Sequence, residues 1–332
     1  MKNIITLALT LGIMYNSVCQ DFTKDTVYLS ILEDNPNFTF FNFGIDIFNI
    51  SFDNNAMPIG TGATFGFAME SIYGGVNYQR GGELISSQED LGQNSARSIY
   101  GGGYNNETHG TRNDFSSFIG YAVKTNKKKK SKTLRLKDEG RVSYVTEVDA
   151  TEKSQYCIET GFNTGYTYYQ ASLGEGMRGI PYGPDNQLSN YASEELNVST
   201  VFQFNTIQLG FAFNRRHDIV AKAKGFGDRR SNGFTRFYAR LNYLVSSSLD
   251  DVIKPANQMS LSDDSHFMYN LNEANEMNKI GLNIGFSYAP IKKFGWHATA
   301  ELGIAPGPKL GIRKNAYLFL KCGVSLAALF KK

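Results

Sequence analysis

The strongest constraint on the fold is an alternating stretch near the middle of the chain, residues 156–169, which reads YCIETGFNTGYTYY. One alternating set is apolar with aromatic ends, and the other is small or polar and contains Glu159. A period of two predicts a β-strand. The small polar set cannot be the core face of an ordinary sandwich. The pattern favours a strand whose apolar face meets lipid and whose polar face lines a wet lumen, as in a membrane β-barrel.

The same alternation recurs along the chain and predicts an all-β fold, a single antiparallel transmembrane barrel of about 10–12 strands. Long polar connections begin near residues 81, 170 and 247, and all three fall on the side that we expect to be extracellular. A change of parity near Asn205 predicts a bulge there. Residues 133–137 and 141–148 resemble a further hairpin, and the barrel has about twelve strands if that hairpin enters the wall. The expected strands span residues 41–47, 63–69, 72–78, 117–124, 156–169, 207–213, 234–245, 279–288, 295–304 and 315–330.

The N-terminus has the features of a secretory signal peptide. Lys2 precedes an apolar run over residues 4–14, and Ser17 and Cys19 are small residues at the expected cleavage site. We therefore expect a signal peptide over residues 1–19, cleaved before Gln20, and one barrel domain over residues 20–332. A lipoprotein, acylated at Cys19, is the alternative, but Asn16 stands where such a site has an aliphatic residue. The apolar run is also shorter than the roughly 20 residues of a spanning helix.

Composition limits the class of partner. The mean hydropathy is −0.32, which does not exclude a barrel because barrel strands are only half apolar. A net charge of +3 is too small to imply nucleic acid. Cys157 and Cys322 are assigned to opposite faces of the wall, so we expect two free thiols. The histidines and cysteines show no close ligand spacing, and we expect neither a metal nor another cofactor.

The charged residues assigned to the lumen form one candidate network. In a narrow barrel opposite charges pair, which predicts a plugged lumen; the alternative is a small-solute path selected by Arg236 and Arg240. His297 is expected to be a satisfied lumen histidine. A separate basic run, Lys127, Lys128, Lys129 and Lys130, is either a solvated cluster or a contact for an acidic partner or anionic lipid headgroups. The network comprises Asp46, Glu70, Lys124, Glu159, Arg236, Arg240, Lys279, Glu301 and Lys321.

One loop offers a catalytic alternative. Asp263, Asp264 and His266 lie in a connection that we expect to be extracellular, and an acid beside a histidine can orient a general base. The Asp-Ser-His order is similar to part of the Asp-His pair of the omptin proteases, which are ten-stranded barrels. The resemblance covers three residues, and no second aspartate pair accompanies it. We therefore expect a non-enzymatic protein, with an outer-membrane hydrolase around His266 as the alternative.

Taken together, the signal peptide, the inverted alternation, the loop asymmetry and the near-terminal Phe330 resemble Gram-negative outer-membrane β-barrels as a class. The resemblance spans nearly the whole mature chain, and no motif selects one family. It implies an integral outer-membrane protein surrounded by lipid, acting as a structural or accessory barrel beside other envelope proteins or as a narrow small-solute pore. The alternative is a secreted soluble β-sandwich, which would bury Phe41, Phe43, Phe65, Phe67, Phe211 and Phe213 in a core.

Overall fold

The computed structural model describes residues 28–36, 39–53, 58–83, 112–139, 142–173, 178–182, 190–191, 196–249, 252–255, 266–270, 272, 276–289, 291, 294–308 and 315–330. Within these ranges the regular structure is β-strand. No helix among the described residues is long and apolar enough to cross a membrane. The expected signal peptide over residues 1–19 and the loop aspartates Asp263 and Asp264 lie outside the described part of the chain.

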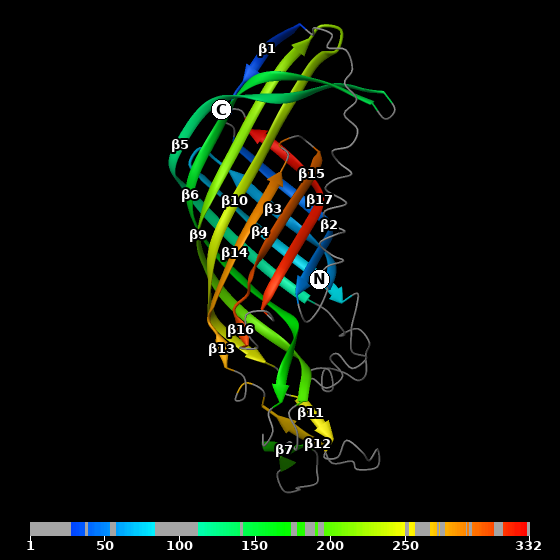
Figure 1. Cartoon of the computed structure of the whole chain (residues 1–332), viewed down its shortest axis with the longest axis vertical. Helices are drawn as coiled ribbons and strands as arrows, with labels where there is room; N and C mark the ends of the chain where they lie inside the picture. Colours follow the sequence, from blue (N-terminus) through cyan, green and yellow to red (C-terminus); the bar gives the residue numbers. More distant parts are fainter. Residues whose placement is uncertain are drawn as a thin grey trace.

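Ten strands form a closed antiparallel barrel (Figure 1). Consecutive wall strands pair with each other, and the last, β17, pairs with the first, β2, so that the wall closes. The expected all-β barrel is therefore confirmed. Its strands are β2 (Thr39–Asp53), β3 (Pro58–Ala68), β4 (Ile72–Glu83), β5 (Arg112–Glu139), β6 (Val142–Leu173), β9 (Leu196–Ala223), β10 (Gly227–Leu249), β14 (Ile280–Ala289), β15 (Gly295–Ile304) and β17 (Ala316–Phe330).

The two faces of the wall differ in polarity as the alternation predicts. On β9, for example, Leu209 and Phe211 are 58% and 71% exposed, whereas Gln208 and Ala212, on either side of this pair, are buried. Large apolar side chains cover the outside of the other wall strands in the same way, including Phe43 and Phe65. A soluble sandwich would need these phenylalanines in a core. Their exposure, together with a polar interior, is the arrangement that a lipid-facing barrel requires.

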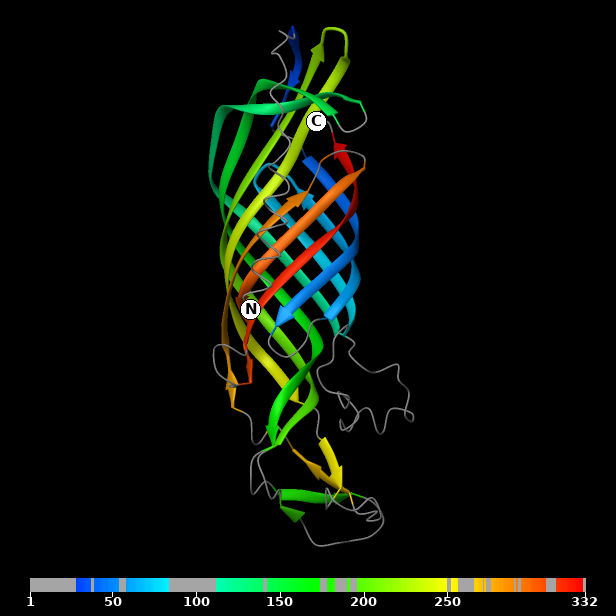
Figure 2. The same ribbon diagram turned by 45° about the vertical axis from the view of Figure 1, so that its right-hand side comes forward.

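The ends of the barrel are unequal. At one end the connections are short, such as residues 69–71 and 224–226. At the other end the chain extends far from the wall (Figure 2). Because outer-membrane barrels have short periplasmic turns and long outer loops, we assign the short-turn end to the periplasm. The outer end carries the short strands β7 (Arg178–Tyr182), β8 (Asn190–Tyr191), β11 (Val252–Pro255), β12 (His266–Tyr269), β13 (Met277–Asn278) and β16 (Gly307–Pro308).

Two bulges set which face some residues occupy. The register between β5 and β6 shifts at Val123, so that Lys124 pairs with the outward-facing Tyr156. The register between β9 and β10 shifts at Val245, whereas the pairing of β9 with β6 is continuous. A bulge was expected near Asn205 on β9. That position is wrong, because the bulge lies on the neighbouring strand β10. Phe202 and Phe204 are out of step with the lipid-facing set because they line the interior.

A second β-layer stands at the periplasmic end, and we name it the periplasmic platform. Strands β5 and β6 continue past the wall as a hairpin that bends across the ends of β9 and β10 (Figure 1). The twelve-strand alternative is thus wrong, because the hairpin over residues 133–148 prolongs two wall strands and adds none. β1 (Leu29–Asp34) pairs with β9 over residues 219–223, beyond Arg216, where the pairing of β6 ends.

The platform has its own apolar core. Leu134 and Ala150 of the hairpin and Ile219 and Ala221 of β9 are completely buried. Leu136, Val148 and Ala223 complete the cluster, against which Leu29 and Phe226 pack. Burial of one such leucine contributes roughly 1.5–3 kcal/mol. The platform is therefore a packed structure that the membrane-spanning wall does not need for its closure.

Candidate functional site

Glu159 of β6 is the centre of a buried charge network inside the barrel. Its carboxylate accepts hydrogen bonds from Arg236 Nε at 2.5 Å and Nη2 at 2.6 Å, from Arg240 Nε at 3.0 Å and from the Tyr73 hydroxyl. The alternation of β6 and β10 turns all three charged side chains inward. Glu159 is 1% exposed, so its charge is stabilised by the two guanidinium groups rather than by bulk water.

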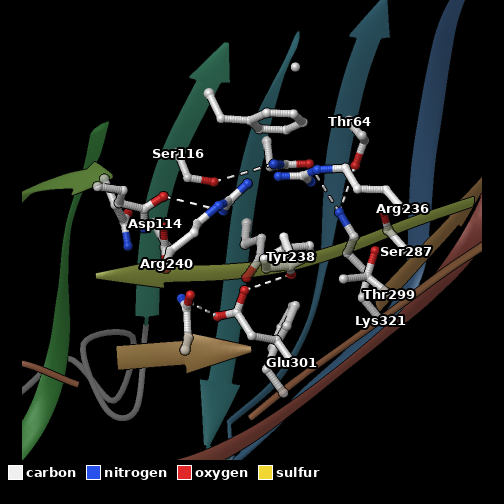
Figure 3. Close-up of a pocket in the computed structure, with 18 of the residues that line it drawn as sticks. Thr64, Asp114, Ser116, Arg236, Tyr238, Arg240, Ser287, Thr299, Glu301 and Lys321 are labelled. Carbon is white, nitrogen blue, oxygen red and sulfur yellow. Dashed lines mark hydrogen bonds between the residues drawn. The ribbon is translucent and has the colours of Figure 1, made fainter. Parts of the chain in front are cut away.

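Aromatic rings cover the two guanidinium groups. The Arg236 guanidinium carbon lies 4.0 Å from the centroid of Phe118 and 4.3 Å from that of Tyr238. Arg240 contacts the same two rings at 5.0 and 4.3 Å. Figure 3 shows Arg236, Tyr238 and Arg240 projecting from one strand into the interior. Cation–π contacts of this kind favour buried arginine, and the rings also exclude water from the ion pairs.

Two glycines provide room for the tyrosines of this network. An added Cβ at Gly120 would lie 2.3 Å from the ring of Tyr73, and one at Gly285 would lie 2.3 Å from the ring of Tyr238. Each ring therefore lies flat on a wall position that only glycine leaves open. Seated in this way, Tyr73 reaches Glu159 and Tyr238 donates to Glu301 at 2.7 Å.

Asp46 of β2 anchors a second network on the opposite wall. It is fully buried and contacts His297 Nε2 at 2.6 Å, Lys321 Nζ at 3.4 Å and Thr64 Oγ1 at 3.2 Å. Lys321 also donates to Thr64 at 2.8 Å and to Asn77 at 3.1 Å. His297 therefore lies in the lumen with a carboxylate partner, while its Nδ1 atom has no hydrogen-bond partner among the residues that the structure describes.

Six of the nine residues assigned to the lumen lie inside the barrel: Asp46, Glu159, Arg236, Arg240, Glu301 and Lys321. The prediction is wrong for the other three, Glu70, Lys124 and Lys279, because their side chains are exposed. Glu70 lies in the turn between β3 and β4. Lys124 faces outward because the bulge at Val123 reverses its parity. Lys279 lies one residue before β14, at the outer end of the barrel.

Tyr73, Tyr238 and Asn283 bond to carboxylates of the lumen, although the sequence pattern did not assign them to the charge network. Tyr73 and Tyr238 are aromatic residues on the polar alternating set, and each lies near a glycine on a neighbouring strand. That combination is the signal that could have identified them. Asn283 gives no such signal, because asparagine is common on any wet face.

An apolar plug closes the lumen toward the periplasm. Seven inward side chains from six wall strands and one turn pack together: Phe40, Ala68, Tyr73, Cys157, Ala212, Tyr238 and Ile291. Beyond them, Arg216 donates to the backbone oxygens of Met69 and Glu70 at 3.0 and 2.9 Å. Cys157 and Cys322 are both free, as expected for thiols on opposite faces.

A cavity of about 300 Å³ remains inside the barrel. Its lining reaches from the plug, at Phe40 and Phe234, to Phe202 and Pro306 near the outer end. Most of the wall positions between these ends are amides, hydroxyls and the charged groups of the two networks. Among the described residues, no group of three or more His, Cys, Asp and Glu side chains is placed to hold a metal ion.

The basic run lies on the platform. Lys127, Lys128, Lys129 and Lys130 are exposed on β5, just beyond the lipid-facing residues Tyr121 and Val123. Lys130 and Lys132 pair with the buried carboxylate of Glu152 at 2.9 and 2.6 Å, which attaches this part of β5 to β6.

No protein-family model matches the sequence, and no curated protein matches it. Among solved structures, the β-domain of the Bordetella autotransporter BrkA is similar over 88% of this chain and 100% of its own, at 10% identity and a TM-score of 0.27. OmpT, an outer membrane protein of Vibrio cholerae, is similar over 90% of this chain and 100% of its own, at 8% identity and a TM-score of 0.18. The chain has the fold of an outer-membrane β-barrel. That statement rests on the closed strand pairing and the lipid-facing surface, since these scores carry no argument of their own.

Proposed function

We propose that this protein is a non-enzymatic accessory barrel of the outer membrane, exported by means of a cleaved signal peptide, whose periplasmic platform contacts other envelope proteins. The observation that carries the proposal is the combination of a plugged lumen with a separately packed periplasmic layer. A barrel that serves as a conduit has no use for such a layer, and a plugged barrel has to act through its surfaces.

The platform offers features that suit a protein partner. Near the tip of the hairpin, Tyr144 and Val145 are 44% and 55% exposed, although this end of the molecule faces water. On β10, the pairing with β14 begins only at Phe234. Residues 227–233 therefore have one edge without a described strand partner. An open edge of this kind can accept an added strand from another chain.

The basic run suits the membrane surface. Residues 124–153 hold ten Lys and Arg against five Asp and Glu, so this segment alone is more positive than the +3 of the whole chain. Its lysines follow directly on the lipid-facing belt. Contact with anionic headgroups is worth about 1 kcal/mol for each lysine near the surface, which would hold the hairpin beside the membrane.

Site-specific photo-crosslinking in cells tests the role of the platform. We expect a crosslinker at Tyr144 to capture an envelope protein, whereas one at the lipid-facing Leu209, which is similarly exposed, captures none. Equal capture from both positions, or none from Tyr144 and Val145, would contradict the proposal.

A second function, a narrow pore, is favoured by the cavity within the lumen. Planar-bilayer recording separates the two, with insertion verified by heat-modifiable mobility. A silent bilayer is expected for the plugged barrel. A steady conductance whose ion selectivity shifts with charge reversal at Arg236 and Arg240 would identify a pore. The hydrolase alternative would require that His266→Ala abolish a measured activity.

A further inference from the structure

We propose that the lumen cavity is a binding site for a small, neutral, polyhydroxylated solute of about the size of a hexose. This inference is independent of the platform. It rests on buried donors and acceptors of cavity-lining residues that have no hydrogen-bond partner in the described part of the chain, and on the charge balance around them.

Arg240 provides the donor. Its Nε donates to Glu159 at 3.0 Å and its Nη1 to Gln208 Oε1 at 3.3 Å. These two contacts fix the plane of the guanidinium group. Its Nη2 is buried and has no hydrogen-bond partner among the described residues, so one strong donor remains unused on a residue that lines the cavity.

Asn283 provides the acceptor. Its Nδ2 donates to Glu301 Oε1 at 3.1 Å and to the Tyr317 hydroxyl at 3.2 Å. Glu301 also accepts hydrogen bonds from Tyr238 and Tyr317, as an ionised carboxylate does. A carboxylate cannot donate, so the amide orientation is determined by chemistry. The buried Oδ1 that remains has no hydrogen-bond partner within the described ranges and must be an acceptor.

The register places this donor and this acceptor side by side. Arg240 of β10 is paired directly with Asn283 of β14, and both face inward. Asn163 and Asn242 line the same cavity, and each has a buried amide oxygen for which the described residues provide no partner. Buried polar atoms normally find partners. A hydroxyl group both accepts and donates, so a solute that carries several hydroxyls satisfies all four positions.

The charges of the lining exclude an anion as the preferred ligand. Three cations, Arg236, Arg240 and Lys321, and two carboxylates, on Asp114 and Glu301, line the cavity. Glu159 pairs with both arginines and Asp46 pairs with Lys321 from positions outside this lining, so each of the three cations already has a carboxylate partner. The cavity therefore lacks the surplus positive charge that a phosphate or carboxylate ligand needs.

Size and shape agree with a small saccharide. A volume of about 300 Å³ is at the lower end of the range for small-molecule sites. Phe118, Phe202 and Phe204 add apolar faces to the polar lining, and the C–H face of a sugar ring packs on such surfaces. The plug closes the inner end, so the solute is bound rather than passed through.

Saturation-transfer difference NMR on the folded protein in detergent micelles tests the proposal, with D-glucose as the probe. Inorganic phosphate is the charged comparison, and its binding is measured by competition with glucose. Cyclohexanol is the apolar comparison. We expect transfer to glucose, no competition by phosphate, and a loss of affinity of about tenfold in Asn283→Leu, since removal of one hydrogen bond to a ligand is commonly of that size. Gln155→Leu, a buried amide that donates to the Glu70 backbone oxygen beyond the plug, is the matched control.

Folding of each variant is verified by heat-modifiable mobility, and Asn242→Leu replaces Asn283→Leu if the latter does not fold. Absence of transfer to glucose would overturn the proposal, as would transfer that survives in the folded cavity variants. Competition by phosphate or stronger transfer to cyclohexanol would assign the cavity to another class of ligand and would overturn it equally. Crosslinking from the platform is unaffected by any of these outcomes.

Discussion

Replacing Glu159 by glutamine changes the charge at the centre of the lumen while keeping the shape of the side chain. In the native barrel the carboxylate receives three hydrogen bonds of 2.5, 2.6 and 3.0 Å from two guanidinium groups. The amide has only one acceptor oxygen and turns an N–H₂ donor toward the other arginine. Removing one partner of a buried ion pair typically costs 3–5 kcal/mol. We therefore expect Glu159→Gln to lower the free energy of unfolding by about 3–5 kcal/mol.

Urea unfolding from lipid vesicles measures this loss. The single tryptophan of the chain, Trp296, is 63% exposed on the lipid face of β15, so its fluorescence reports departure from the membrane. Glu147→Gln on the exposed side of the platform is the matched control and should change stability by less than about 0.5 kcal/mol. A loss of less than 1 kcal/mol in Glu159→Gln would refute the reasoning, because the two arginines would then be held by something other than this charge.

Three further outcomes follow from the structure. Leu134→Ala, at a completely buried site, should destabilise the platform by about 2–5 kcal/mol; hydrogen exchange should rise in residues 127–150 while heat-modifiable mobility of the barrel is unchanged. Burial lowers the pKa of His217 on the platform from 6.5 to about 4, so the folded state favours the neutral ring. The free energy of unfolding therefore falls by up to about 3 kcal/mol as the pH falls from 6.5 to 4. His217→Asn should remove this part of the acid-induced increase in hydrogen exchange. Gly120→Ala should displace the ring of Tyr73 from Glu159 and cost about 1–3 kcal/mol in the urea assay, whereas a change below 0.5 kcal/mol would mean that the ring has another position.

The fold could be predicted from the sequence because lipid and water impose opposite requirements on alternate residues. The expected strands at residues 156–169 and 234–245 lie within β6 and β10, and the side assignments of Glu159, Arg236 and Arg240 agree with the structure. Alternation is a local property, so short windows suffice to detect it. The loop asymmetry is likewise visible in the sequence alone.

Errors arose where one residue interrupts the alternation. The bulge at Val123 places Lys124 on the outer face. Neither valine nor lysine is a residue type from which a bulge can be predicted. Near the outer end, Phe202 and Phe204 predict a bulge only if lipid is the sole environment available to phenylalanine. They line the cavity instead. Pairings such as Glu159 with Arg236 depend on the register around the whole barrel, which no single strand contains.

The attachment of β1 to β9 has a consequence for the order of assembly. β1 precedes every wall strand in the chain, yet its partner residues 219–223 belong to the sixth wall strand. β1 pairs with the edge of β9 beyond Arg216, where β6 no longer pairs with β9 because it continues into the platform. β1 is synthesised before all the wall strands and therefore cannot take its final place until β9, the sixth of them, is present. Docking of β1 is a late event, and protection of β1 from proteolysis would mark a molecule whose wall and platform are both complete.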